Sequence, residues 1–416
     1  MNRRHFVTST ALATAATTSL APTASAAKPK RALMKLGATV MGGGFRGGFG
    51  EGGPGRGAFP GGPGGPGAPG GPAGPGGPPP TGEAPRRPRP ASTAPRDPEL
   101  GFKSLGRWGI KNVVATAQIA DGRLYATVDE LKRLTDTAAK YGMTVDVLNP
   151  PFLPSSHIDR ERNPAIMLGQ SPQRDRDIEQ IQTMIKNCAA AQIPCIKYNM
   201  SILGVLRTGR TPGRGDTMYS TFNLAEAKAD PPLTRAGTVN ADQYWERITY
   251  FLDRVIPVAT EYKVRMACHP NDSPVPPQGF QGVDAVLATV AGLKKFVSIQ
   301  ESPYHGLNFC QGSVSEMLQD PGKEICDVIR WFGSRKKIFN VHFRNIRGNR
   351  QHYMEVGPDE GSVDMYEAML AYKEVGYQYM VHPDHSVYSP YETGGEYTAF
   401  VYGYIRGLIQ AADRHS

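Results

Sequence analysis

Residues 241–270 read ADQYWERITYFLDRVIPVATEYKVRMACHP, and this stretch decides the fold. Residues 241–262 have the pattern of a helix, and residues 264–269 have the pattern of a short, largely apolar strand. The same pair of patterns recurs along the chain in both directions. Regular alternation of strands and helices is typical of an α/β fold built on a parallel sheet.

This alternation covers most of the chain and sets the number of elements. Strand-like runs occur at residues 33–40, 112–116, 144–148, 195–199, 264–269, 296–300, 338–343 and 377–382. Helix-like segments occur at residues 100–108, 128–142, 176–192, 241–262, 284–295, 315–333, 363–376 and 396–412. These pairs predict a (β/α)8 TIM barrel. An open doubly wound sheet is the alternative, and the barrel is favoured because the count closes and a helix follows the last strand.

The first residues have the pattern of an export signal. Arg3 and Arg4 precede the small-residue stretch TALATAATTSLA, and Ala-Ser-Ala at residues 24–26 supplies a cleavage pattern. A membrane-spanning helix is the alternative, but this stretch is too short and too rich in Thr and Ala to cross roughly 30 Å of hydrocarbon. Residues 1–26 are therefore predicted to be a twin-arginine signal. We expect export to the periplasm or beyond, with the twin-arginine translocon as a transient partner and no stable membrane anchor.

Residues 42–98 are dominated by Gly and Pro, as in GGPGGPGAPGGPAGPGGPPP. Ala68 and Ala73 interrupt the two possible glycine frames, which excludes a collagen triple helix because that helix needs glycine at every third position. The composition predicts a disordered insertion with polyproline II character. It falls in the first strand-to-helix loop, so residues 27–41 hold the first barrel strand and residues 99–416 hold the rest of the barrel.

The excess positive charge of the chain lies in residues 1–98, outside the part that is predicted to form most of the barrel. The net charge is +9 and the isoelectric point is about 9.2. Residues 1–98 hold 12 of the 47 Lys and Arg and 3 of the 38 Asp and Glu, so 35 of each remain in residues 99–416. A nucleic-acid-binding domain would concentrate positive charge in its folded region. We therefore expect no nucleic-acid partner.

Reactive groups of a barrel gather at the C-terminal ends of its strands, and side chains along each strand alternate between the interior and the helices. In residues 264–269 this alternation puts Ala267 and His269 on the interior face and turns Cys268 toward the helices. The sixth strand is expected to end at Glu301, with Cys310 just beyond it. The interior face of the seventh strand is expected to carry Ile338, Asn340, His342 and Arg344. That of the eighth strand is expected to carry Gln378, Met380, His382 and Asp384.

Four adjacent strands therefore end in side chains that can hold a metal ion. In chain order they are His269, then Glu301 or Cys310, then His342, and then Asp384 with His385. Two imidazoles, a thiolate and a carboxylate suit a divalent Mn, Fe or Zn ion with room for a substrate. The remaining cysteines are predicted to be core residues that form no disulfide framework: Cys188, Cys195, Cys268 and Cys326.

Several motifs of this sequence resemble those of the mannonate dehydratase family. In chain order they are IKYNMSILGVLRT, ACHPNDSPVP, HGLNFCQGS, NVHFRNIRG, EGSVDMYEAM and VHPDHS, and the likeness runs from about residue 100 to the C-terminus. The resemblance implies a metal-dependent (β/α)8 barrel that acts as a hydro-lyase. Its expected reaction is the dehydration of D-mannonate to 2-keto-3-deoxy-D-gluconate, with Mn²⁺ or Fe²⁺ as the cofactor.

Carried over position by position, the resemblance also implies site residues. It assigns the metal to His269, Cys310, His342 and Asp384, the same set that strand alternation selects. His385 matches the catalytic histidine of the family. Tyr391 and Tyr397 both stand near the place of the catalytic tyrosine, and the sequence does not decide between them.

Several residues that are expected to contact the substrate depart from the family pattern. Arg344 is expected to bind the substrate carboxylate, and Asn199 and Arg207 are weaker candidates for substrate contacts. His305 stands where the family has an asparagine, and we count it as a substrate contact as well. Other departures are Gln118 in place of a histidine, Asn149 where an acidic residue is common, and Asn271 in place of a second aspartate.

Two alternative functions remain open at this stage. The first is a metal-dependent sugar isomerase or epimerase, because similar barrels use similar ions to stabilise an enediol without loss of water. The second is an exported sugar-acid binding protein without catalytic turnover. In each case the partner is a small sugar or sugar acid, and the sequence leaves open whether the chain forms a homo-oligomer.

Overall fold

The computed structural model describes residues 31–40, 99–119, 122–227, 231–272, 274–275, 279–387, 389, 391 and 395–415. The predicted signal and nearly all of the Gly/Pro-rich insertion lie outside these residues. Within the described part, no helix combines the length and the apolar character that a membrane crossing needs.

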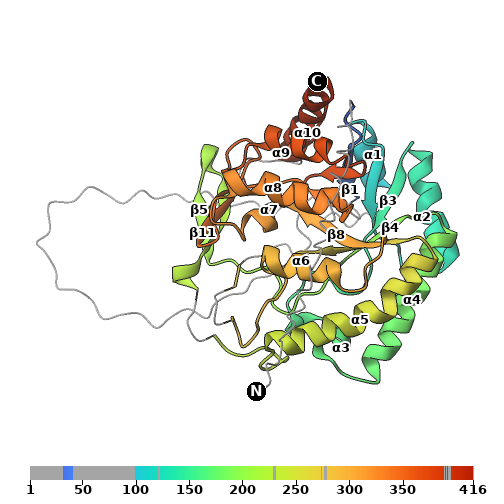
Figure 1. Cartoon of the computed structure of the whole chain (residues 1–416). Helices are drawn as coiled ribbons and strands as arrows, with labels where there is room; N and C mark the ends of the chain where they lie inside the picture. The colour runs from blue at the N-terminus through green and yellow to red at the C-terminus, as the bar shows by residue number, and fades with distance from the viewer. Residues whose placement is uncertain are drawn as a thin grey trace, which may run out of the picture.

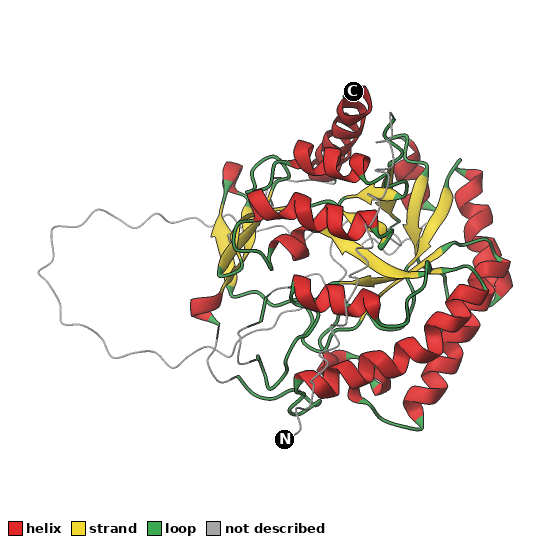
Figure 2. Ribbon diagram, viewed as in Figure 1, coloured by secondary structure: helices red, strands yellow, loops and turns green. Residues whose placement is uncertain are grey.

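Eight parallel strands close into a barrel in the order β1-β12-β9-β8-β7-β4-β3-β2. The strands are β1 Lys35–Thr39, β2 Asn112–Ala115, β3 Thr144–Leu148, β4 Cys195–Asn199, β7 Arg265–His269, β8 His305–Cys310, β9 Ile338–His342 and β12 Met380–His382. Helices surround these strands (Figures 1 and 2). The predicted TIM barrel is therefore confirmed, and the open sheet is excluded because β1 pairs with both β2 and β12.

Ten α-helices are present in the described residues, and capping residues explain where two of them start. The α-helices are α1 Leu100–Gly106, α2 Val128–Lys140, α3 Ala165–Leu168, α4 Gln173–Ala190, α5 Ala241–Glu261, α6 Val290–Ser298, α7 Gln311–Ser315, α8 Pro321–Ser334, α9 Met365–Glu374 and α10 Glu396–Arg414. Short 3-10 helices are η1 Ile158–Arg160, η2 Arg214–Asp216 and η3 Leu224–Glu226. Thr127 with Glu130 and Asn240 with Gln243 form capping boxes that fix the starts of α2 and α5.

Two separate sets of apolar side chains hold the barrel together. One fills the space between strands and helices and includes Met266 and Cys268, as alternation predicts. The other fills the barrel interior and includes Cys195 and Ala267. Cys188 is also fully buried in the core, whereas Cys326 is only half-buried.

The sixth strand was predicted in the wrong place. Residues 296–300 mostly belong to the end of α6, and the barrel strand is β8, which ends at Cys310 itself. A short apolar run such as Phe296–Val297 fits one buried face of a helix as well as a strand, so periodicity alone cannot separate the two. Glu301 is consequently not at the site: its side chain is 71% exposed and pairs with Lys337.

The start of β9 also differs from strict alternation. Its pairing with β8 shifts between Leu307 and Asn308, so one extra residue is inserted in β9. Ile338 therefore packs against the helices and Phe339 fills the barrel interior, the reverse of the prediction. Beyond this point the predicted alternation returns.

A second sheet that the sequence analysis did not predict is formed by segments that follow β4 and β9. Its antiparallel strands, in the order β10-β11-β6-β5, are β5 Gly209–Pro212, β6 Met218–Asn223, β10 Asn345–Asn349 and β11 His352–Val356. Figure 1 shows it as a separate layer beside the barrel. These strands come from loops at the C-terminal strand ends, the side on which barrels build their active sites.

The bulge in β9 depends on Gly306. A Cβ atom at Gly306 would lie 2.7 Å from the Phe339 ring and 2.6 Å from the Lys337 carbonyl oxygen. We expect Gly306→Ala to lower the free energy of unfolding by about 1–3 kcal/mol through this overpacking. Chemical denaturation checks the change. Gly407→Ala is the control, because Gly407 in α10 has no atom within 4 Å of a built Cβ. Equal stability of the two variants would contradict the proposed fit of Phe339 against Gly306.

Candidate metal centre

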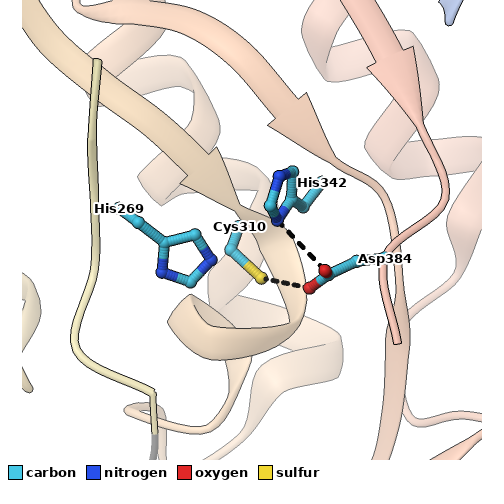
Figure 3. A group of neighbouring side chains, drawn as sticks. All are labelled: His269, Cys310, His342 and Asp384. Atoms are coloured by element: carbon cyan, nitrogen blue, oxygen red, sulfur yellow. Dashed lines mark hydrogen bonds and ion pairs between the residues drawn. The ribbon is translucent and has the colours of Figure 1, made fainter. Parts of the chain in front are cut away.

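Four side chains from four neighbouring barrel segments converge at one point (Figure 3). His269, Cys310 and His342 are the last residues of β7, β8 and β9, and Asp384 follows β12 by two residues. One ligand atom from each lies within 4.8 Å of the corresponding atoms of the others. Barrel closure therefore gathers the four residues that the sequence places at strand ends.

Direct contacts join these side chains. The Cys310 thiol donates to Asp384 Oδ2 at 3.2 Å, and His342 Nδ1 lies 3.2 Å from Asp384 Oδ1. The rings of His269 and His342 are 5.1 Å apart between centroids. His269 Nδ1 lies 2.6 Å from the Pro270 carbonyl oxygen, so this nitrogen carries the proton and Nε2 keeps its lone pair for a ligand.

A third imidazole, His382, lies behind His342 but is excluded from the cluster. Its Nδ1 faces the Pro383 carbonyl oxygen at 2.9 Å, and its Nε2 accepts from the Asn340 amide at 3.0 Å. Both ring nitrogens are therefore in use. Its ring packs edge-on against His342, with centroids 4.8 Å apart, which limits rotation of His342.

Burial decides the protonation of the cluster. It lowers the pKa values of both His269 and His342 to about 4 and raises the pKa of the Cys310 thiol. Burial opposes ionisation of Asp384 as well, but His342 and His385 outweigh it and hold the pKa of Asp384 well below its usual range. At neutral pH the cluster offers neutral imidazoles and a carboxylate, and a thiol that a divalent cation can deprotonate. This donor set fits a first-row metal ion.

His385 lies beside the cluster with carboxylates around its ring. Its Nδ1 is 2.5 Å from Glu355 Oε1 on β11, and its Nε2 is 3.8 Å from Asp272 Oδ2 and 4.0 Å from Asp384 Oδ2. Burial alone would lower the pKa of His385, but Glu355 and Asp384 outweigh it and raise the pKa to about 9. His385 is therefore an imidazolium at neutral pH.

Two buried arginines bind the carboxylates that surround His385. Arg344 donates to Asp384 at 2.9 Å, to Glu316 at 2.7 Å and to Asp272 at 3.1 Å. Arg207 donates to Asp272 at 2.9 Å and pairs with Glu355. In the structure these guanidinium groups hold protein carboxylates in place, and a substrate contact of Arg344 or Arg207 stays a prediction.

A cavity opens onto the cluster. Polar side chains line it next to the candidate ligands: Asn199 at the end of β4, and Ser155 and Ser201 from the loops after β3 and β4. Lys197, on the inner face of β4, also lines it. Asn199 is thus placed where the sequence analysis expected a substrate contact. Hydroxyl and amide groups of this kind are suited to a polyhydroxylated molecule.

The remaining predicted residues fall in different places. His305 is the first residue of β8, at the opposite end from Cys310; its Nε2 lies 2.9 Å from the Phe296 carbonyl oxygen and its ring packs on Phe296. It is a core residue, so its assignment to the substrate is corrected. Tyr391 is 70% exposed and bonds Asp216 at 2.9 Å. Tyr397 lines a second cavity together with Arg344, Asp384 and His385, which favours it over Tyr391.

Sequence reasoning missed three groups of this site. Asp272 lies inside the quoted motif ACHPNDSPVP, and its position three residues beyond a strand-end histidine was the available signal. Lys197 lies on the interior face of a predicted strand, where a lysine among apolar residues is unusual. Glu355 gave no signal, because it reaches the site only through the second sheet.

Comparison with known proteins agrees with this geometry. The sequence profile of the family "D-mannonate dehydratase (UxuA)" matches residues 223–416. Mannonate dehydratase of Thermotoga maritima is 28% identical over 313 residues, which cover 67% of this chain and 82% of the relative. Mannonate dehydratase of Endomicrobium trichonymphae is 29% identical over 314 residues, with 67% and 81% covered.

The crystal structure of mannonate dehydratase from Streptococcus suis serotype 2 has the same fold. Its TM-score is 0.63 at 21% identity, and the match covers 74% of this chain and 88% of that chain. The sequence matches run through the strands that carry the converging histidines, cysteine and aspartate. The chain is therefore similar to mannonate dehydratases over two thirds of its length, and residues 223–416 match the family profile.

Proposed function

We propose that this protein is a metal-dependent hydro-lyase that dehydrates D-mannonate, or a close analogue, to 2-keto-3-deoxy-D-gluconate. Similarity to mannonate dehydratases supports the reaction. The observation that carries the proposal is the convergence of His269, Cys310, His342 and Asp384 on a cavity that also holds the imidazolium of His385.

The four converging side chains are the proposed ligands of a Mn²⁺ or Fe²⁺ ion. Imidazole nitrogen, carboxylate oxygen and thiolate sulfur are all donors that such ions accept. When bound, the ion supplies Lewis acidity toward substrate oxygens. Arg344 holds Asp384 from one side, and the His382 ring packs against His342 from another, so the donors are fixed in place before an ion arrives.

Dehydration transfers the proton of the carbon next to the substrate carboxylate to a basic group of the site and expels the hydroxyl group of the neighbouring carbon, so that a C=C bond replaces the broken C–H and C–O bonds. His385 is placed to supply a proton to the leaving oxygen, so that it departs as water. Glu355 holds Nδ1 of His385, which directs Nε2 toward the cavity with its transferable proton. The enol that forms then takes up a proton and becomes the keto product.

Tyr397 is the proposed catalytic tyrosine. Burial raises its pKa, so it remains a neutral phenol and acts as an acid or hydrogen-bond donor at neutral pH. It shares the second cavity with His385. Tyr391 is far more exposed and makes its bond to Asp216 outside both cavities.

We further propose that residues 1–26 direct twin-arginine export. The supporting features are Arg3 and Arg4, the Thr- and Ala-rich stretch and the Ala-Ser-Ala pattern at residues 24–26. A protein that must hold its metal before leaving the cytoplasm would use this route, because the route carries folded proteins.

The product decides between dehydration and isomerisation. Metal-loaded protein incubated with a panel of hexonates is expected to form a 2-keto-3-deoxy acid from D-mannonate, measured by chromatography of the products. His385→Asn is expected to lower kcat by about 10²- to 10⁴-fold, because a general acid is lost. His352→Asn is the control, since His352 is exposed on β11. An epimer without loss of water would instead identify an isomerase.

Metal binding is expected to depend on Cys310 and on pH. Burial raises the pKa of this thiol, so uptake of an ion must release its proton, and affinity should fall as pH falls. Calorimetry in buffers of different ionisation enthalpy measures the released protons. Cys310→Ser is expected to weaken binding at least about 10- to 100-fold, whereas Cys326→Ser, which changes a half-buried helical cysteine, should not. Tight binding by Cys310→Ser would remove Cys310 from the ligand set.

Export is testable by replacing the arginine pair. The double variant Arg3→Lys, Arg4→Lys is expected to accumulate in the cytoplasm at full length, whereas the natural sequence yields a shortened exported form. Fractionation and mass measurement of the N-terminus give the result. Unchanged export of the double variant would contradict a twin-arginine route.

A further inference from the structure

Lys197 occupies the middle of β4, a strand whose five residues are all buried. Its neighbour across the pairing with β7 is Ala267, which packs in the barrel interior, and the next inward-facing pair toward the C-terminal end is Asn199 with His269. Lys197 therefore points into the barrel, one layer below the candidate metal centre. Only 3% of Lys197 is exposed, yet it lines the cavity.

Lys197 differs from the other cationic side chains near the cavity. Among the described residues that line it, Lys197 is the only lysine or arginine; the other cation there is the His385 imidazolium, whose ring nitrogens face the carboxylates of Glu355, Asp272 and Asp384. Arg207 and Arg344 donate to Asp272, Glu316, Glu355 and Asp384, and neither lines this cavity. A sugar acid carries a carboxylate, and a buried carboxylate needs a cationic or hydrogen-bonding partner. The substrate hydroxyl groups have Ser155, Asn199 and Ser201 available.

The electrostatics of the site are consistent with an anion next to Lys197. Burial lowers the pKa of this lysine to about 8, while Asp384 and Cys310 act in the opposite direction. Lys197 in turn contributes to lowering the pKa of both His269 and His342. Lys197 also lines the same cavity as His269, His342 and Asp384. A desolvated ammonium group is stabilised when a carboxylate arrives.

We propose that the Lys197 ammonium group binds the substrate carboxylate and holds it next to the metal centre. This inference rests on the proposed function, because it takes a sugar acid as the ligand. The bound carboxylate is adjacent to the carbon that loses its proton. The same positive charge then stabilises the extra negative charge that the carboxylate takes on as the enediolate forms. Lys197 is thus the residue that selects an acid over a neutral sugar.

The test compares an anionic ligand with its neutral analogue. Titration calorimetry on metal-loaded protein measures the affinity for D-mannonate and for D-mannonamide, in which an uncharged amide replaces the carboxylate. The natural protein is expected to prefer the acid. Lys197→Met should weaken binding of the acid by about 10- to 100-fold and that of the amide by much less, so the preference disappears. Lys197→Arg should keep a preference for the acid because it keeps the charge.

Lys373→Met is the matched control. Lys373 is also a buried lysine, but it lies on α9 and donates to the Ala412 carbonyl oxygen at 2.9 Å, outside the cavity. This variant should keep the full preference for the acid. Metal content is measured for every variant, and if Lys197→Met does not fold, Lys197→Gln takes its place against Lys197→Arg.

The outcomes separate this inference from the proposed function. If the natural protein dehydrates D-mannonate but the uncharged variant at position 197 keeps the preference for the acid, the inference fails and the proposed function stands. If the two ligands lose affinity equally, Lys197 has only a structural role and the inference fails. If the acid preference depends on Lys197 but no dehydration occurs with any hexonate, the inference stands and the proposed function fails.

Discussion

The buried guanidinium group of Arg344 is the interaction on which the site depends. It lies between Glu316, Asp272 and Asp384, which come from three different parts of the chain. Removing it would take a cationic partner from three buried carboxylates, and breaking a buried ion pair costs about 3–5 kcal/mol. Gly312 is part of the same constraint, because a Cβ atom there would lie 2.4 Å from the Arg344 side chain. The position of Asp384 is thus fixed by charge as well as by the backbone.

The second sheet extends this network from the barrel to the loops. Tyr353 and Glu355 on β11 both contact Arg207, and Glu355 also holds His385. The barrel strands supply the imidazoles and the thiol, while the antiparallel sheet sets the charge of His385. Division of labour between a rigid barrel and the segments after its strands is a general property of this fold. In this protein the barrel strands supply metal ligands, and the antiparallel sheet holds the histidine that is proposed to transfer the proton.

The barrel could be predicted because its strands and helices repeat with clear periods, and seven of the eight strand regions were placed correctly. His269 and His342 followed from strand alternation and from the rule on strand ends, whereas Cys310 was separated from Glu301 only by the family resemblance, because the sixth strand was placed too early. The sixth strand was missed because Phe296 and Val297 pack on one face of a helix as readily as in a strand. The roles of Arg344 and His305 could not be predicted, because they depend on partners that are distant in the sequence.

Burial of the cysteines limits their reaction with oxidants in the solvent. Cys188, Cys195, Cys268 and Cys310 are each no more than 1% exposed, and Cys326 is half-buried. Peroxide or a thiol-exchange reagent can reach a sulfur only where solvent can. The four fully buried thiols are therefore expected to be oxidised mainly while the chain is unfolded, because folding removes them from solvent.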